Sequence, residues 1–370
     1  MDPAGDLLYK IAFASLRSIA PAPARDILAL TGSEQGFFET PASTLSAVMS
    51  RRSRLFDEDY RRTLLEKARR ECDFIASYNI RPIYFTDPEY PQRLLEIPDA
   101  PLMIYTLGEC DLNRSHMISI VGTRHLTPYG ADFINRCVAD LAQMLAEPPV
   151  IVSGLAYGAD VTAHQAAISN SLPTIGVLAH GLNTIYPAAH RQIAAEMVRG
   201  GGMLLTDYTS AENIHRGNFL ARNRIVAGLT DCTIVAESAT KGGALVTARL
   251  AGDYSRDVFA LPGRTSDRFS QGCNGLIASN MAQLVTSAED IIKAMRWPIK
   301  PVEATTGSLF PELTEQEQAI LDFLNEKPDC QLNMISANIG IPVGKLMSIL
   351  IDMEFRGLVI PYPGGKYRPA

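Results

Sequence analysis

The sequence has no paired-cysteine motif, no long apolar run and no phosphate-binding P-loop, and each absence excludes a class of protein. Its six cysteines stand far apart at positions 72, 110, 137, 232, 273 and 330, so no CxxC and no zinc-finger spacing occurs. We expect free thiols in a reducing cytoplasm and no bound metal. No apolar stretch is long enough to span a bilayer, and the acidic, interrupted start of the chain predicts no signal peptide.

The sequence also predicts neither a bound nucleotide cofactor nor a polycationic surface over the whole protein. Neither GxxxxGK[ST] nor GxGxxG occurs, so neither a triphosphate nor a dinucleotide is indicated, and no cofactor is predicted. The net charge is −6, which means that any nucleic-acid site must be local. The 370 residues, 46% hydrophobic and 20% charged, predict a soluble globular chain of roughly two or three domains.

Residues 1–78 predict a small helical domain that is similar to SAM or helix-hairpin-helix domains. Residues 19–30 resemble a helix-hairpin-helix turn, but alanine and prolines stand where glycines would let backbone amides approach a phosphate. Residues 57–79 form the clearest helix, which Asp57 or one of its neighbours can cap, and an apolar stripe lies on one side. Its arginines alternate with acidic residues, which predicts a solvated face.

Residues 79–296 predict an α/β domain with a doubly wound, Rossmann-like and mostly parallel sheet. Short apolar runs alternate with helical segments, as buried parallel strands do. The runs lie at residues 117–122, 150–154, 174–179, 202–207, 232–238 and 257–263. Ligands of such sheets bind outside the carboxyl ends of the strands.

Glycine-bearing turns follow three of these runs and lead into predicted helices. They are Gly122-Thr123-Arg124, Ser153-Gly154 and Lys241-Gly242-Gly243. Such a turn frees backbone N–H groups to meet an anion at a helix N-terminus, and Arg124 could supply the countercharge. The turns predict phosphate binding, although glycines serving tight turns alone would give the same pattern.

The stretch 215–229 carries Arg216, Arg222 and Arg224 around the aromatic Phe219, with no acidic residue between Glu212 and Asp231. It predicts a basic, aromatic-bearing loop that runs into a helix. Guanidinium groups neutralise phosphates and a ring stacks on an unpaired base, so the stretch favours single-stranded nucleic acid. The alternative is a solvated turn whose arginines pair with carboxylates elsewhere.

Catalysis has weak support in the sequence. Asp160 and His164 are four residues apart and share a helix face, but a histidine that ties loops together is the favoured interpretation. No Ser-His-Asp set, paired carboxylates or metal-ligand set stands out, so we predict that the chain is not an enzyme.

The C-terminal part predicts a linker at 297–312 and a winged-helix-like domain at 313–370. A capping-box pattern joins Thr314 to Glu317, and helical segments precede a short Gly-Gly hairpin. The presumed recognition helix holds Lys345 but also Asp352 and Glu354, a poor surface for reading DNA. A protein-contact or structural module is therefore favoured over duplex binding.

Seven motifs in order resemble the bacterial DNA-processing protein A (Smf) family: SIVGTR, SGLAYGADVTAH, GLNTIYP, FLARNRIVAGL, KGGALVTA, the LPG element and GCNGLI. The resemblance implies an extended Rossmann domain that binds single-stranded DNA without hydrolysing it. It further implies a cytoplasmic homodimer that protects incoming DNA and loads the RecA recombinase in natural transformation (competence), with no membrane association.

The resemblance also assigns residues. The implied DNA pocket comprises Gly122, Thr123, Arg124, Ser153, Gly154, Arg216, Asn218, Phe219, Arg222, Asn223, Arg224, Lys241, Gly242 and Gly243. The implied dimer face comprises Leu276, Ile277 and Met281. Two departures from the family stand out: Leu220 replaces a proline of FPxRNR, and Lys241 adds a charge in a turn that commonly reads SGS or SGA.

Two other functions remain open from the residues. Related Rossmann proteins, the phosphoribohydrolases, cleave nucleoside monophosphates, but their PGGxGT signature is absent. A regulator that binds duplex DNA through the C-terminal domain is the third possibility.

Overall fold

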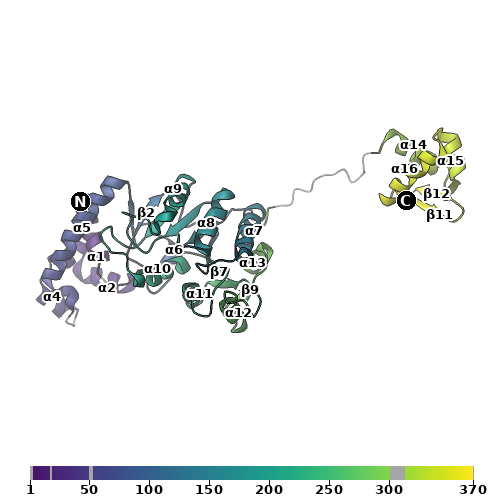
Figure 1. Ribbon diagram of the computed structural model, residues 1–370. Helices are drawn as coiled ribbons and strands as arrows, with labels where there is room; N and C mark the ends of the chain where they lie inside the picture. The colour runs from purple at the N-terminus through teal and green to yellow at the C-terminus, as the bar shows by residue number, and fades with distance from the viewer. Residues whose placement is uncertain (1–2, 17–18, 50–52, 301–312, 370) are drawn as a thin grey trace. The chain divides into compact units, whose positions relative to one another are not determined.

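The computed structural model describes residues 3–16, 19–49, 53–300 and 313–369 (Figure 1). Contacts divide the chain into two compact units, residues 1–300 and 301–370. The predicted boundaries at 78/79 and 296/297 stay predictions, and most of the predicted linker, residues 301–312, lies outside the described residues. Residues 297–300 pack on the first unit, where Lys300 N donates to Met144 O at 2.7 Å.

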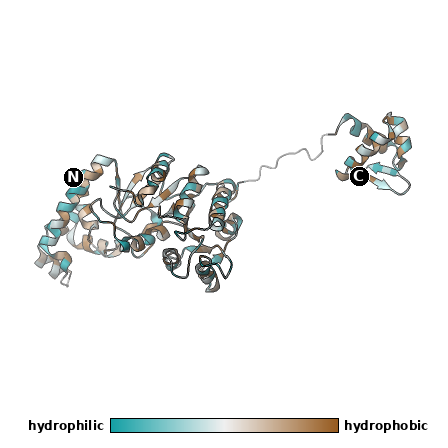
Figure 2. Ribbon diagram, in the orientation of Figure 1, coloured by the Kyte–Doolittle hydropathy of each residue, from teal (hydrophilic) through white to brown (hydrophobic). Residues whose placement is uncertain are grey.

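The first unit begins with helices, as expected from residues 1–78. They are α1 (Pro3–Ala14), α2 (Pro21–Thr31), α3 (Glu34–Glu39), α4 (Ala42–Val48), the 3-10 helix η1 (Arg54–Phe56) and α5 (Glu58–Tyr78). Asp57 caps α5 and accepts from Tyr60 N at 2.9 Å, which confirms the predicted helix start. In Figure 2 the outer helices carry both hydrophobic and hydrophilic residues, as helices packed on a core do.

The predicted solvated face of α5 is wrong at two positions. Arg61 is buried and its Nη1 donates to the carbonyls of Phe37 and Thr40 at 2.6 and 2.8 Å. Glu71 is buried and accepts from both Ser210 N and Ser210 Oγ, at 2.8 and 2.5 Å. The carbonyls at the end of α3 and the backbone N–H of Ser210 need hydrogen-bond partners, and Arg61 and Glu71 supply them. The alternation of charges along α5 does not reveal these distant partners.

The sheet has nine strands in the order β1-β2-β6-β5-β4-β3-β7-β8-β9. Their bounds are β1 (Arg81–Tyr84), β2 (Met103–Gly108), β3 (Met117–Val121), β4 (Val150–Ser153), β5 (Thr174–Val177), β6 (Met203–Thr206), β7 (Cys232–Val235), β8 (Asp257–Ala260) and β9 (Gln283–Leu284). Strands from β6 to β9 in this order pair in parallel, as predicted, whereas β1 and β2 add an antiparallel edge that the sequence did not reveal.

Both faces of the sheet are buried. Val150 and Val152 of β4 join the core that includes the N-terminal helices, whereas Ile151 joins the core on the opposite face. This two-residue alternation explains why the strand runs are apolar throughout. The remaining helical segments are α6 (Gln92–Leu95), α7 (Pro128–Met144), α8 (Ala159–Ser169), η2 (Ala188–His190), α9 (Arg191–Arg199), α10 (Arg216–Gly228), α11 (Gly243–Asp253), α12 (Gln271–Ala278) and α13 (Ala288–Met295).

The strand order reverses at β3. From β3 the chain builds β4, β5 and β6 on one side of the sheet, and then returns to place β7, β8 and β9 on the other. A doubly wound sheet opens a crevice at such a switch point, outside the carboxyl ends of the two neighbouring strands. The ends of β3 and β7 therefore locate the site.

The second unit has the winged-helix fold that the sequence predicts. It contains α14 (Glu315–Glu326), β10 (Cys330–Gln331), α15 (Leu332–Ile339), α16 (Val343–Phe355), β11 (Val359–Tyr362) and β12 (Lys366–Pro369), around a hydrophobic core of its own. The predicted capping box at Thr314 and Glu317 is present. No single helix of the described chain is long and apolar enough to cross a membrane, although α15 and α16, bent by 109°, pass together on length and composition alone.

Candidate nucleic-acid interface

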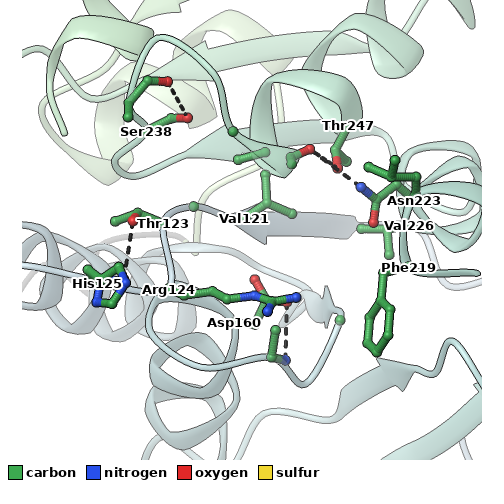
Figure 3. Close-up of a pocket in the computed structure, with 18 of the residues that line it drawn as sticks. Val121, Thr123, Arg124, His125, Asp160, Phe219, Asn223, Val226, Ser238 and Thr247 are labelled. Carbon is green, nitrogen blue, oxygen red and sulfur yellow. Dashed lines mark hydrogen bonds between the residues drawn. The ribbon is translucent and has the colours of Figure 1, made fainter. Parts of the chain in front are cut away.

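A cavity of about 770 Å³ opens at the switch point (Figure 3). The turns after β3, β4 and β7 form one wall, and α10 and residues 268–269 form others. The cavity brings together most of the predicted site: Gly122, Thr123, Arg124, Gly154, Arg216, Phe219, Arg222, Asn223, Lys241, Gly242 and Gly243. It does not include Ser153, Asn218 or Arg224.

The basic stretch is a helix, not the predicted loop. α10 starts at Arg216, where the ring of His215 accepts from Gly217 N at 3.1 Å and caps the helix. Helical spacing turns Phe219 and Asn223 toward the cavity, while Asn218 and Arg224 line a second cavity on the other side of α10. Asn223 also donates to Gly243 O at 3.4 Å, which links α10 to the start of α11 (Figure 3).

Arg222 lies in the wall of the cavity but its charge is used internally. Its side chain is only 4% exposed, and Nη1 donates to Gly154 O at 2.9 Å and also to Val177 O. Burial lowers the pKa of Arg222, and the carboxylate of Asp160 opposes that shift. The guanidinium therefore holds the ends of β4 and β5 together, which a count of basic residues could not show.

Arg224 and Ser153 are likewise occupied elsewhere. Arg224 Nη2 donates to Asp207 Oδ2 at 2.6 Å, on the face of α10 away from the cavity. The alternative that the arginines pair with distant carboxylates thus holds for this one. Ser153 is buried and its Oγ donates to Ile120 O at 2.6 Å, tying β4 to β3.

Arg124 and Phe219 face one another across the cavity (Figure 3). The guanidinium carbon of Arg124 lies 5.8 Å from the centre of the Phe219 ring, within range of a cation–π contact. The ring of Tyr186 meets Phe219 edge to face at 5.7 Å. A charged group and two aromatic rings therefore meet beside the turn after β3.

The sequence did not single out a second aromatic and basic group at the cavity. Phe269 stacks on His125 with centres 6.1 Å apart and planes at 24°, and Arg268 lies over the Phe269 ring at 5.7 Å. All three residues line the cavity. An arginine close to a phenylalanine is the same signal that marks Phe219, but Arg268 and Phe269 lie in an irregular segment between β8 and α12.

The charge of the cavity is positive. Arg124, Arg216, Lys241 and Arg268 are exposed and make no ion pair with any described residue. Asp160, the acidic residue in the lining, is buried, and desolvation raises the pKa of its carboxyl. Glu237, close to the same turns, accepts from Thr127 N and Thr127 Oγ1 at 2.9 and 2.5 Å.

Gly154 and Gly158 have no room for a side chain, because other groups of the site lie close to their backbone. Gly158 has φ +75°, and a Cβ there would lie 2.2 Å from Thr123 O, so the turn after β3 could not keep its place. A Cβ on Gly154 would lie 2.5 Å from the Arg222 guanidinium. Gly243 differs, because a Cβ there would meet nothing within 4 Å and the start of α11 opens onto free space.

His164 has the structural place that the sequence favoured. It is fully buried on α8, and its Nδ1 lies 2.7 Å from Thr174 Oγ1 of β5. Burial, with His190 and Arg222 nearby, lowers the pKa of His164 to about 3, so the ring is neutral in the folded protein. Within the described ranges no group of three or more His, Cys, Asp or Glu residues is placed to hold a metal ion.

The predicted dimer residues divide between core and surface. Leu276 of α12 is buried in the core of the sheet domain and Ile277 is partly buried against it. Met281 is 44% exposed, beside the edge strand β9. Leu276 is therefore a core residue, and only the other two can contribute to a surface.

Comparison with known proteins decides the family. The family model described as DNA recombination-mediator protein A matches residues 81–296, and one described as DprA winged helix domain matches residues 303–365. The chain belongs to the DNA recombination-mediator protein A family. This confirms the resemblance seen in the seven motifs.

Relatives in the family extend over most of the chain. Protein Smf of Synechocystis sp. is 33% identical over 318 residues, covering 76% of this chain and 78% of that protein. The X-ray structure of DNA processing protein A (DprA) from Streptococcus pneumoniae superposes with a TM-score of 0.62 at 30% identity, covering 77% of this chain and 96% of the other. DNA processing protein A from Helicobacter pylori, solved to describe its single-stranded DNA binding mode, gives 0.53 at 29% identity, with 59% and 96% covered.

Proposed function

We propose that this recombination mediator binds single-stranded DNA in the switch-point cavity. It would protect incoming single strands in the cytoplasm and load the RecA recombinase onto them during natural transformation. The observation that carries the proposal is the lining of the cavity, where four exposed cations that pair with no carboxylate of the described residues surround two aromatic groups, and the acidic residue is buried. The single-stranded DNA binding stated for the Helicobacter pylori relative supports it.

The chemistry of the lining favours an unpaired strand. Phosphates attract exposed guanidinium and ammonium groups, and unstacked bases find a face on Phe219 or Phe269. A duplex keeps its bases stacked inside and offers these rings nothing. The role requires no bond to be made or broken by the chain itself, so we propose a binding protein and not an enzyme.

The test is fluorescence anisotropy with labelled oligo-dT and with a duplex of equal length, across a salt series. We expect preference for the single strand and, if Arg124, Arg216, Lys241 and Arg268 each meet a phosphate, a slope of log K against log salt of about −3. Arg124→Ala and Arg268→Ala should each weaken binding about tenfold and flatten the slope by roughly 0.7.

Arg249→Ala is the matched control, because this exposed arginine lies on α11 outside the cavity. It removes the same charge and should leave affinity nearly unchanged. An equal loss of DNA affinity in Arg249→Ala and Arg124→Ala would show that binding depends on the total charge of the protein and not on the cavity. Equal or better duplex binding, untouched by either change, would reject the cavity as the site and favour the C-terminal unit.

Recombinase loading needs a separate measurement. We expect the wild-type chain to speed DNA-dependent ATP hydrolysis by RecA on single strands coated with single-strand-binding protein. Arg124→Ala should lose this effect in proportion to its loss of DNA affinity. Full stimulation by a variant that no longer binds DNA would contradict the proposed order, in which binding precedes loading.

We also propose that two copies associate through the surface beside β9. Met281 and Leu284 are exposed and Ile277 is partly buried, and these apolar residues lie close in sequence to the open sheet edge at β9, where a second copy can cover them. Met281→Asp should shift the sedimentation coefficient toward the monomer. An unchanged oligomeric state would place the contact elsewhere.

A further inference from the structure

The switch-point cavity has a pair of aromatic rings at each of two places. One pair is Phe219 of α10 with Tyr186, which meet edge to face at 5.7 Å. The other pair is His125 with Phe269, whose ring centres are 6.1 Å apart and whose planes differ by 24°. All four rings line the cavity. Arg124 separates the two places, because its guanidinium points toward Phe219 and His125 lies at the other end of its side chain (Figure 3).

The second pair has an open ring face on the side of His125. Phe269 is half-buried and Arg268 lies over its ring, 5.7 Å from the centre, whereas the imidazole is exposed. The backbone N of His125 donates to Thr123 Oγ1 at 3.1 Å, but neither ring nitrogen has a hydrogen-bond partner among the described residues. An exposed flat ring that is supported from behind by a second ring offers an unpaired base a surface for stacking.

The cation between the two pairs suits the group that joins two bases. Neighbouring bases of a strand are connected through one phosphodiester, and a guanidinium binds phosphate oxygens in a bidentate manner. Arg124 is exposed and pairs with no carboxylate of the described chain. A strand with one base at each ring pair therefore places the intervening phosphate near Arg124. Arg268, beside Phe269, is a second exposed cation for the phosphate that follows.

We propose that the cavity binds two neighbouring nucleotides of a strand, with one base on Phe219 and the next on the open face of His125. This inference rests on the proposed single-stranded DNA binding and adds His125 as a base-stacking residue. Every base has a π-face, so the site tolerates any sequence. A mononucleotide reaches one ring pair at a time, whereas two linked nucleotides reach both, and the link raises the effective concentration of the second base.

Substitutions at His125 test the ring itself in the anisotropy assay with oligo-dT. His125→Ala should weaken binding about fivefold to a hundredfold, which is the usual cost of removing one stacked ring. His125→Phe should restore the lost affinity, because the ring face returns, and His125→Gln should not. Tyr78→Ala is the matched control, since Tyr78 is also an exposed ring that packs on a phenylalanine, Phe74 at 4.7 Å, but lies on α5 outside the cavity. It should bind as the wild type does. Rescue by His125→Gln and not by His125→Phe would overturn the proposal, because His125 would then hydrogen-bond to the strand and not stack.

Short competitors test the number of bases in the wild-type chain, without any substitution. Thymidine 3′,5′-bisphosphate is compared with the dinucleotide dTpdT that carries a phosphate at each end. The dinucleotide should displace oligo-dT at a concentration about fivefold to a hundredfold lower. Removal of either base from the dinucleotide, leaving an abasic sugar, should cancel this gain. In His125→Ala one of the two abasic dinucleotides should compete as well as the intact one, because its missing base has no ring to stack on.

The outcomes separate this inference from the proposed function. Equal competition by the mononucleotide and the dinucleotide, with unchanged binding by His125→Ala, overturns the two-base site. Single-stranded DNA binding in the cavity then still stands if Arg124→Ala weakens oligo-dT binding. A wild-type chain whose oligo-dT binding does not depend on Arg124 overturns the proposed function and this inference together.

Discussion

Replacement of the buried Arg222 should unfold the first unit more readily without touching any group that meets DNA. Methionine at this position keeps most of the side-chain volume, so little cavity forms. It leaves the carbonyls of Gly154 and Val177 without their donor and the buried Asp160 without its nearby cation. Hydrogen bonds to a charged group contribute about 1.5–3 kcal/mol each, and breaking a buried pair costs about 3–5 kcal/mol.

These terms overlap, so we expect Arg222→Met to lower the free energy of unfolding by about 3–5 kcal/mol. That is a large part of the roughly 5–15 kcal/mol that stabilises a domain. The assay is urea unfolding followed by tryptophan fluorescence. The single tryptophan, Trp297, lies 4.6 Å from the ring of His116 in the first unit, so its emission reports on that unit.

Arg124→Met is the matched control, since the same residue type stands exposed in the same cavity. It should change stability by less than about 0.5 kcal/mol while weakening DNA binding. A stable Arg222→Met that has lost DNA affinity would refute the structural role given to this arginine and return it to the set of DNA ligands. An equal loss of stability in both variants would refute the reasoning from burial.

Three further changes separate binding from folding. Phe269→Ala should weaken oligo-dT binding about fivefold to a hundredfold by removing a stacking face, and an unchanged anisotropy curve would exclude the ring from the site. Arg61→Met should lower the free energy of unfolding by roughly 3 kcal/mol, because buried carbonyls lose their hydrogen-bond donor. Urea denaturation followed by circular dichroism measures this change, and an unchanged midpoint would contradict it. The unfolded chain takes up a proton at His164 near pH 6.5, whereas the folded chain does so only near pH 3. Protonation of the unfolded state therefore lowers the free energy of unfolding as the pH falls from 6.5 to 3, and no such loss occurs above pH 6.5. His164→Asn should therefore flatten the stability–pH curve between pH 6.5 and 3, by up to about 1.4 kcal/mol per pH unit, and parallel curves would contradict the buried neutral ring.

The parallel strands were predictable because each is buried on both faces and therefore apolar throughout. Periodicity also located α5 and its cap at Asp57. The antiparallel edge strands β1 and β2 were missed, because short runs such as 81–84 carry arginine and proline and give no clear pattern. Strand order is set by contacts between distant segments, so the switch point between β3 and β7 could not be read from either strand.

The candidate site was predictable in composition but not in geometry. A run of arginines around Phe219 identifies a basic surface, yet the helix phase sends Arg222 inward, Arg224 to the far side and Arg216 outward. The local sequence does not indicate which carbonyl or carboxylate forms a hydrogen bond or ion pair with each arginine. Phe269 lies about fifty residues along the chain, and only the folded sheet brings it beside the turn after β3.

The N-terminal helices and one face of the sheet share a single hydrophobic core, so the two parts do not fold as separate modules. Side chains of α1, α2 and α5 pack in one cluster with strand residues, and Glu71 holds the segment that leads into α10 through Ser210. A fragment cut at residue 79 would expose that apolar surface and release Ser210. Removal of the N-terminal helices should therefore destabilise the sheet domain, whereas the winged-helix unit has a core of its own and can be removed without exposing the core of the first unit.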